Sequence, residues 1–265
     1  MISVITKGRY GNSMFQCAAA YVYSLKHELE FHAPDKSLAP HLWPVYLQHL
    51  SNDNWNSDLE TVSVNDGKHT YTPLPFKEEW RDKNIMIGTT DINTGYLQSF
   101  RYLEGYEPAI RKAFKLEAVT MPYTCSIHFR GGDYYQYPDK HPVITVEYLR
   151  EAINAMIAKT GCQWYFVYTD DIPHCIEVMA EVTKLFSGIR FVLNLAGDEE
   201  DDFINLMAHA NAITANSSFS VLAAILNPNP EKVVICPDES NYFGPGNSHL
   251  SVEDLYPPNW IRIKY

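Results

Sequence analysis

Four short segments of the 265-residue chain combine small, polar and charged residues that could hold an anionic or sugar ligand. Each segment follows a run of apolar residues typical of a β-strand. Ligands of open α/β sheets bind beyond the carboxyl ends of the strands, so each segment is expected at such an edge. The segments are Lys7–Asn12, His128–Asp133, Thr169–Asp171 and Asn216–Ser220.

The segment around Arg130 has the composition of a phosphate clamp. Gly131 and Gly132 let backbone amides approach a ligand closely, and the guanidinium of Arg130 can bridge two phosphate oxygens in a fork that lysine cannot reproduce. His128 lies two residues before Arg130, on the same face of the expected strand. The alternative for these residues is a simple turn in which Arg130 pairs with Asp133.

A second anion site is suggested by Asn216, Ser217 and Ser218, which precede the apolar helical stretch Val221–Leu226. Hydroxyls and unpaired amides at the start of a helix can hold an anion at the positive end of its dipole. The alternative is that Ser217 or Ser218 only caps the helix.

Acidic residues in two places could form a metal site, but the surrounding sequence pattern favours other roles for them. Asp170 and Asp171 could hold Mg²⁺ or Mn²⁺, but Asp171 precedes Ile172–Pro173 and an apolar helical pattern, which indicates a helix cap. Either carboxylate could also hydrogen-bond a nucleotide base or ribose. The run Asp198–Asp202 is typical of the first turn of a helix. The ten histidines form no HxxxH or HxH pair, so no metal site is expected.

The elements that must position these segments follow an α/β pattern. The second half alternates strand-like runs with helical spacing, which predicts a mostly parallel, doubly wound sheet. The expected strands there are Cys125–Arg130, Trp164–Thr169, Ile189–Leu193, Ala212–Ala215 and Lys232–Cys236, and Thr145 is expected to cap the helix after the first of them.

The first half opens in the same way, with a strand at Ile2–Thr6 and a helix at about Ser13–Leu29. Further regular segments are expected at Leu47–Leu50, Thr61–Val64, Asn84–Gly88 and Glu107–Leu116, and Met121–Pro122 is expected to break the pattern. We therefore expect domains at 1–118 and 119–240, followed by an irregular tail, 241–265, that packs across both.

Composition limits the class of protein. Apolar residues make up 46% and charged residues 20% of the chain, as in globular proteins, and the net charge of −11 disfavours nucleic acid as a partner. Five cysteines without a CxxC pair indicate buried thiols rather than disulfides or zinc. The stretch Tyr10–Lys26 has polar interruptions and lacks a cleavage site, so neither a signal peptide nor a transmembrane segment is expected, and we expect a cytoplasmic protein.

Five segments, in the order in which they occur, resemble motifs of the α-1,2-fucosyltransferases, glycosyltransferase family 11. The resemblance covers nearly the whole chain and extends more distantly to the protein O-fucosyltransferases and α-1,6-fucosyltransferases. The matching residues are Gly8–Gln16 (family GGLGNQMFQ), Gly95–Ser99 (GYFQS), His128–Tyr134 (HVRRGDY), Phe166–Asp171 (FxxFSDD), and Asp202–Met207 with Ala215–Ser220 (DLxLMS and ANSSFS).

This resemblance implies a two-domain GT-B fold of Rossmann-like domains, with the acceptor handled mainly by the N-terminal domain and a GDP-sugar by the C-terminal one. It implies that Arg130 contacts the diphosphate and that Asn12 faces the reacting sugar. Asp133 is a candidate general base. The implied donor-binding residues are Gly11, His128, Arg130, Asp170, Asp171, Asn216, Ser217, Ser218 and Phe219.

The expected function is a metal-independent inverting glycosyltransferase that needs no cofactor. It would move L-fucose from GDP-fucose to a hydroxyl of a galactoside or related glycan. The sequence departs from the family at Gly131, where the second arginine of HVRRGDY stands, and at Ser13, Val221 and Leu222. The alternatives are a different nucleotide-sugar donor, a metal-dependent transferase that uses Asp170 and Asp171, and a non-catalytic glycan-binding protein.

Overall fold

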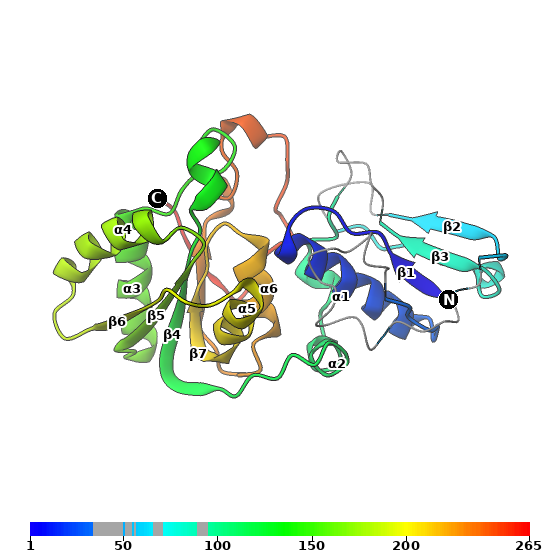
Figure 1. Ribbon diagram of the computed structural model, residues 1–265, viewed down its shortest axis with the longest axis horizontal. Coiled ribbons are helices and arrows are strands. Elements are labelled where there is room, and N and C mark those ends of the chain that lie inside the picture. Colours follow the sequence, from blue (N-terminus) through cyan, green and yellow to red (C-terminus); the bar gives the residue numbers. More distant parts are fainter. Residues whose placement is uncertain (34–49, 51–54, 56, 66–70, 89–94) are drawn as a thin grey trace. The chain divides into compact units, whose positions relative to one another are not determined.

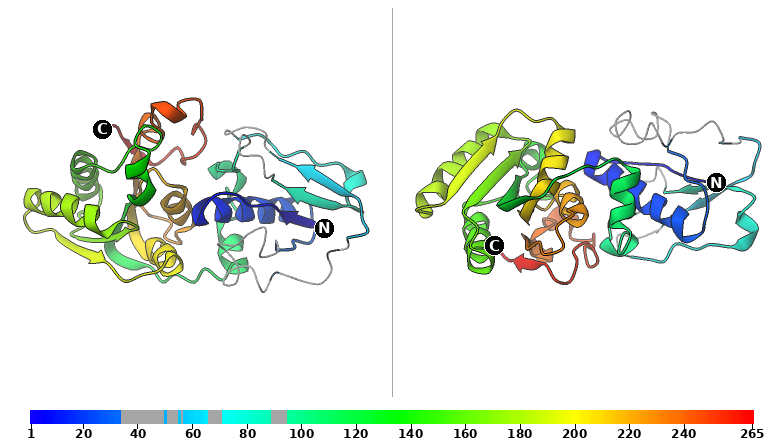
Figure 2. Two further views of the ribbon diagram at one scale, coloured as in Figure 1. Left: turned by 45° about the horizontal axis from the view of Figure 1, so that its top comes forward. Right: turned by 90° about the horizontal axis from the view of Figure 1, so that it is seen from below.

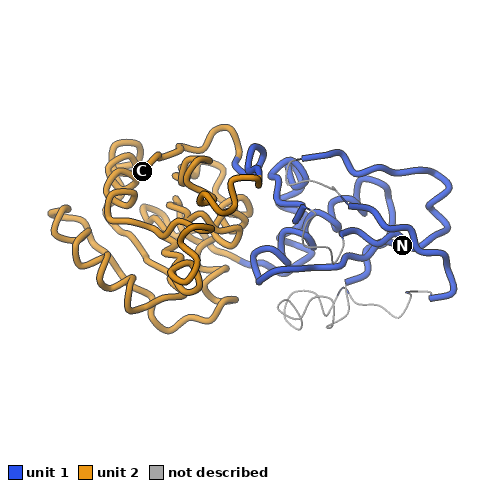
Figure 3. Tube along the Cα trace, turned by 90° about the horizontal axis from the view of Figure 1, so that it is seen from above, with its two compact units in different colours: residues 1–117, 251–256 blue, residues 118–250, 257–265 orange. Residues whose placement is uncertain are grey.

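The computed structural model describes residues 1–33, 50, 55, 57–65, 71–88 and 95–265. The chain divides into two compact units, shown in different colours in Figure 3. Unit 1 comprises Met1–Glu117 and Ser251–Tyr256, and unit 2 comprises Ala118–Leu250 and Pro257–Tyr265. The division between residues 117 and 118 lies beside the boundary expected from the sequence, and the C-terminal stretch is shared between the units.

Unit 1 is a small α/β unit with a three-stranded parallel sheet in the order β1-β3-β2. Its elements are β1 (Ile2–Val4), α1 (Tyr10–Lys26), β2 (Thr61–Val64), β3 (Asn84–Ile87) and α2 (Glu107–Ala113). α1 begins at Tyr10 rather than Ser13, because Arg9 is the extended N-cap residue. It stops before Leu29, because Glu28 takes a left-handed conformation with φ 53°.

Unit 2 holds a six-stranded parallel sheet in the order β6-β5-β4-β7-β8-β9. Helices α3 and α4 cover one face, and α5 and α6 cover the other (Figure 1; Figure 2). The elements are β4 (Met121–Phe129), α3 (Val146–Thr160), β5 (Trp164–Thr169), α4 (Ile172–Leu185), β6 (Arg190–Asn194), α5 (Glu199–Ala208), β7 (His209–Ile213), α6 (Ser218–Leu226), β8 (Val234–Pro237) and β9 (Ile261–Ile263).

The apolar strands of unit 2 form the core that the alternating pattern predicts. Ile127 of β4, Tyr148 of α3 and Met179 of α4 belong to one buried cluster between the sheet and its helices. Thr145 caps α3 as expected, because its side chain accepts a hydrogen bond from the Tyr148 amide at 3.2 Å. The α/β fold class with parallel sheets is confirmed.

Two expectations about elements were wrong. Met121–Pro122 does not break the chain's regular structure; it starts β4, and the strand absorbs it through a register shift between Met121 and Cys125. The tail after residue 240 is not wholly irregular either, since β9 pairs in parallel with β8. Of the regular segment expected at Leu47–Leu50, residues 47–49 lie outside the described residues.

The buried cysteines agree with the sequence expectation. All five cysteines are unbonded and buried. Within the described part of the chain, no helix is both long enough and apolar enough to span a lipid bilayer.

Candidate functional site

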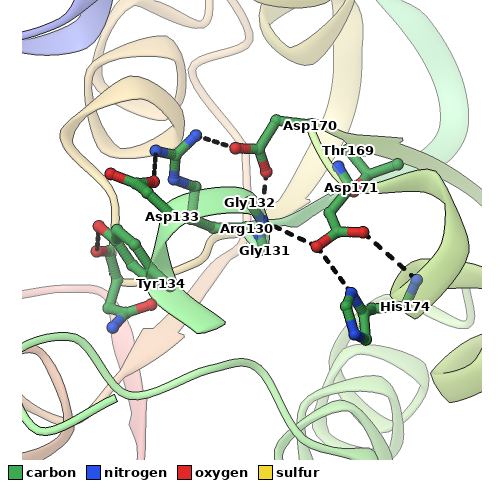
Figure 4. Close-up of polar contacts among 10 residues, drawn as sticks. Arg130, Gly131, Gly132, Asp133, Tyr134, Thr169, Asp170, Asp171 and His174 are labelled. Carbon is green, nitrogen blue, oxygen red and sulfur yellow. Dashed lines mark hydrogen bonds and ion pairs between the residues drawn. The ribbon is translucent and has the colours of Figure 1, made fainter. Parts of the chain in front are cut away.

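Two of the polar segments meet at the carboxyl edge of the sheet in unit 2. β4 and β5 are neighbours, and Phe129 at the end of β4 pairs in register with Thr169 at the end of β5. The residues that follow each strand, Arg130–Asp133 and Asp170–Asp171, therefore leave the sheet side by side. Figure 4 shows their polar contacts.

Arg130 lies between carboxylates from both segments. Its guanidinium forms ion pairs with Asp133 at 2.5 Å and with Asp170, and it lies 4.9 Å from the centre of the Tyr134 ring (Figure 4). The side chain of Arg130 is only 14% exposed. The pair with Asp133, which the sequence offered as an alternative to a phosphate clamp, is thus present, and Asp170 joins it.

The glycine amides of the loop also point at carboxylates. The Gly131 amide donates to Asp170 Oδ1, and the Gly132 amide donates to Asp171 Oδ2, each at 2.9 Å. Asp170 is therefore held by a guanidinium and a backbone amide together. Donors of these kinds bind phosphate oxygens in anion sites, and here they hold the carboxylates of Asp170 and Asp171.

The missing side chains of the two glycines make room for the two aspartates. A Cβ at Gly131 would lie 2.5 Å from the Asp171 Cβ, and one at Gly132 would lie 2.7 Å from Asp170 Oδ2. Gly132 also has a φ of 51°, which favours glycine. The two loops are consequently fitted to each other. Gly131, which replaces an arginine of the family motif, therefore has a packing role of its own.

Asp171 is the N-cap of α4, as expected. Its side chain accepts from the His174 amide at 3.4 Å and from the His174 Nδ1 at 2.8 Å. Burial opposes its ionisation, but hydrogen bonds from His174 and Gly132 outweigh burial and lower the pKa of Asp171. The sequence assigned His174 no part in the site, because a single histidine in a first helical turn carries no signal.

His128 and Asn216 bring polar atoms into buried places. His128 is 5% exposed, its ring centre lies 5.4 Å from that of Phe219, and its Nδ1 has no hydrogen-bond partner. Burial and, secondarily, Arg130 lower the pKa of His128 to about 3, so the ring is neutral at pH 7. Asn216 donates to the Pro142 carbonyl at 2.8 Å, but its Oδ1 is unpartnered. Buried polar atoms without partners are rare and mark places where a ligand can supply one.

The start of α6 differs from the capping expectation. Ser217 occupies the N-cap position, but its side chain makes no capping hydrogen bond. Ser220 Oγ instead accepts from the Ala215 amide at 3.2 Å and donates to the Ser217 carbonyl at 3.3 Å. The Ser218 amide is hydrogen-bonded to Tyr242. Ser220 and Tyr242 thus organise this turn. The sequence pattern included Ser220 only as the end of the segment Asn216–Ser220, and it did not single out Tyr242.

Unit 1 joins two other motifs at the end of β1. Gln16 accepts from the Lys7 amide and donates to the Lys7 and Asn12 carbonyls, and Gln98 donates to Asn12 Oδ1 at 2.5 Å. Lys7 Nζ lies 4.6 Å from the centre of the Tyr96 ring. Gly11 and Asn12 lie in the first turn of α1 rather than in a loop. The structure therefore brings Asn12 together with Gln98. Gly11 also lies in unit 1, whereas the remaining expected site residues belong to unit 2.

Asp202 is a further carboxylate of unit 2, and the sequence pattern placed it with Asp198 in the first turn of a helix. Asp198 caps α5 by accepting from the Glu200 and Asp201 amides, as that pattern implies. Asp202 instead turns inward and accepts from Asn194 Nδ2 at 2.9 Å. Burial raises the pKa of Asp202 to about 6, so it is protonated more readily than an ordinary aspartate.

The sequence model of glycosyl transferase family 11 matches residues 113–264, more than half of the chain and all of the site in unit 2. This chain belongs to glycosyl transferase family 11. The family inferred from the five motifs is therefore confirmed.

Two relatives are similar to this chain in sequence, and one solved structure is similar to it in fold. An Escherichia coli α-1,2-colitosyltransferase is 25% identical over 214 residues, 71% of this chain and 69% of the relative. The E. coli O-antigen biosynthesis glycosyltransferase WbnK is 29% identical over 145 residues, which span 53% of this chain and 44% of that protein. The structure of E. coli heptosyltransferase WaaC with ADP has a TM-score of 0.50 at 13% identity, covering 99% of this chain and 92% of WaaC, and is alike in fold.

Proposed function

We propose that this glycosyltransferase is an inverting enzyme that moves L-fucose from GDP-fucose to a hydroxyl of a galactoside or related glycan. The observation that carries the proposal is the cradle formed by Arg130 and the Gly131 amide, which holds a carboxylate at the carboxyl edge of the sheet. Phosphate oxygens accept hydrogen bonds from the same kinds of donor. Family membership and a relative that transfers colitose support a deoxy sugar as the group transferred.

In this proposal Arg130 stabilises the leaving GDP. Inversion proceeds by a single in-line displacement, in which charge develops on the diphosphate as the bond to the sugar breaks. Asp133 and Asp170 hold the guanidinium in place, and a guanidinium has five N–H donors, so further donors remain for phosphate oxygens. The neutral His128 ring and the Asn216 Oδ1, both buried, offer polar contacts to the nucleoside or sugar.

The structure changes the role that we propose for Asp133. The sequence offered Asp133 as the base that takes the proton of the acceptor hydroxyl. Its carboxylate is ion-paired with Arg130 at 2.5 Å, so it is already engaged with the guanidinium. We therefore assign Asp133 to orienting Arg130. Asn12 and Gly11 keep their proposed place near the reacting sugar on the family resemblance.

Catalysis without a divalent metal is part of the proposal. Asp170 and Asp171 bind Arg130, two backbone amides and His174, which are all hydrogen-bond donors. A cationic side chain and amides can carry the diphosphate charge that a metal would otherwise neutralise. We expect turnover to persist in excess EDTA. A strict requirement for added Mg²⁺ or Mn²⁺ would assign Asp170 and Asp171 to a metal instead.

The donor is tested by titration calorimetry with GDP, UDP, ADP and CMP. We expect GDP to bind at least about 10-fold more tightly than the others, and tighter binding of UDP would overturn the proposed donor. Turnover with GDP-fucose and GDP-colitose then separates fucosyl from colitosyl transfer, the second candidate, which the colitosyltransferase relative favours. Binding of GDP without turnover of either sugar on a panel of galactosides would favour a glycan-binding protein.

A further inference from the structure

His174 closes a ring of contacts around the glycine loop, the segment Arg130–Asp133 that contains Gly131 and Gly132. Asp171 Oδ2 receives the Gly132 amide at 2.9 Å and the His174 Nδ1 at 2.8 Å, so one carboxylate oxygen links α4 to the loop (Figure 4). Gly132 begins the short 3₁₀ helix Gly132–Gln136. The position of that turn thus depends on an oxygen whose own orientation is set by His174.

The other side of the His174 ring contacts the same turn. Tyr135 stacks on His174, with ring centres 3.8 Å apart and the ring planes 17° from parallel. Tyr135 belongs to the 3₁₀ helix that Gly132 begins. His174 is therefore attached to this turn twice, through Asp171 by a hydrogen bond and through Tyr135 by stacking.

These attachments lie at the surface, and the carboxylate that they hold is less exposed than the His174 ring. The His174 side chain is 43% exposed, whereas that of Asp171 is 11% exposed. A half-exposed ring contributes little to the core, so its replacement should leave the protein folded. His174 nonetheless holds Asp171, and Gly131 packs against that aspartate so closely that a Cβ at Gly131 would collide with it.

We infer that His174 is a positioning residue for the Arg130 cradle, acting mainly through its hydrogen bond to Asp171, with the stack on Tyr135 as a weaker second contact. The hydrogen bond from Nδ1 orients the Asp171 carboxylate, which receives the Gly132 amide and thereby fixes the peptide that follows Arg130 and Gly131. The expected effect on turnover rests on the proposed function, because a fixed cradle matters for catalysis only if it places the diphosphate. Misplacement of a catalytic group by a fraction of an ångström lowers turnover.

Two variants of His174 separate its hydrogen bond from its ring. His174→Asn keeps a donor close to the position of Nδ1 but shortens the stacked surface. His174→Phe keeps a ring for Tyr135 but has no donor. His27→Phe is a matched control, because His27 is stacked on Phe76 in unit 1 with ring centres 4.1 Å apart. Each variant is compared with the wild type in melting temperature, kcat and KM for the sugar nucleotide, and amide hydrogen exchange of the peptide that contains residues 131–136.

We expect His174→Phe to lower kcat by about 5-fold and to speed exchange of the 131–136 amides by a similar factor, the effect of losing one hydrogen bond. His174→Asn should restore both to within about 2-fold of the wild type, and His27→Phe should change neither. Melting temperatures should agree within about 4 °C, the shift that loss of one hydrogen bond allows. Unchanged exchange in His174→Phe, or equal defects in the Phe and Asn variants, would overturn the inference. The exchange readout needs no substrate, so absence of turnover in the wild type would count against the proposed function alone.

Discussion

Arg130 is the residue on which the proposed chemistry depends most. It is held by Asp133 and Asp170, so its removal would also leave two carboxylates without their counter-ion. A role in transition-state stabilisation and a role in holding the loop therefore predict different kinetics.

We expect Arg130→Ala to lower kcat by about 100-fold or more, the usual effect of removing one preorganised donor to developing charge. Arg130→Lys should recover little, because an ammonium cannot make the forked contact. Steady-state kinetics and thermal melting of both variants, with Asp133→Ala as comparison, provide the measurement. If Arg130→Ala and Asp133→Ala both lost stability but kept near-normal kcat, Arg130 would be a structural residue only.

Gly131 should tolerate no side chain. A Cβ at this position would lie 2.5 Å from the Asp171 Cβ, and backbone rather than a flexible side-chain end would have to move. We expect Gly131→Ala to lower the melting temperature by about 3–8 °C, corresponding to about 2 kcal/mol, and to weaken GDP binding. Gly161→Ala serves as control, since its added Cβ meets nothing within 4 Å, although its φ of 67° carries a cost of its own. Gly131→Ala with wild-type stability and binding would contradict the fitted-loop interpretation.

At the scale of elements, the ends of neighbouring strands bring charged side chains together, and the first turns of helices determine which partners those side chains bind. The first turn of α5 shows this most clearly, because it carries four acidic residues and only some of them face solvent. Asp202 points back toward Asn194 at the end of β6. The turn thus places a partly buried carboxyl where the helix dipole favours its charge but the surroundings oppose it.

Asp202 should make the protein less stable as the pH rises. The pKa of Asp202 is raised from 3.8 to about 6 by burial, so the folded state favours the protonated form. Its stabilising contribution is complete below pH ~4 and is lost as the pH rises through about 6. Because the group is partly solvated, we expect Asp202→Asn to gain about 1 kcal/mol, or about 2–4 °C in melting temperature, at pH 7.5 and nothing at pH 4. Melting curves from pH 4 to 8 test this, and a larger gain at pH 4 than at pH 7.5 would refute it.

At the scale of the whole molecule, each unit contains two segments that are separate in the sequence. Residues 251–256 belong to unit 1, and the chain then returns to unit 2 and adds β9 beside β8. Asn241 also holds the last residue, since its side chain donates to the Tyr265 carbonyl at 2.6 Å and accepts from the Tyr265 amide at 3.2 Å. The last nine residues therefore belong to unit 2, and Ile261–Ile263 among them join its sheet.

Removing residues 257–265 should destabilise unit 2. The deletion takes away β9 and leaves β8 as an unprotected edge, which promotes association between chains. We expect the melting temperature to fall by about 5–10 °C, and aggregates to appear in light scattering. Arg262→Ala, which changes only a side chain of β9, should lower the melting temperature by no more than about 2 °C. A truncated chain that melted with the wild type would show that β9 contributes little.

Local pattern was sufficient for the regular half of the protein. Apolar runs at strand length and a 3.6-residue spacing predicted the limits of β5 and the caps at Thr145 and Asp171, because each depends on neighbours close in sequence. The alternation of such runs with helical spacing indicated a parallel sheet. The pairing of Arg130 with Asp133, offered as an alternative, is likewise a contact three residues apart. The five motifs also sufficed to place the chain in its family.

Only the tertiary structure decided how these residues are used. Asp170 and Asp171 bind the glycine loop because β4 and β5 end side by side, a contact across about 40 positions that no local pattern encodes. The same holds for His174 on Tyr135, for Gln98 on Asn12, and for β9 on β8. The burial that lowers the pKa of His128 and raises that of Asp202 also depends on the packed environment of each side chain. Sequence determined which chemical groups reach the edge of the sheet, and packing determined their partners, because hydrogen bonds and desolvation act through space rather than along the chain.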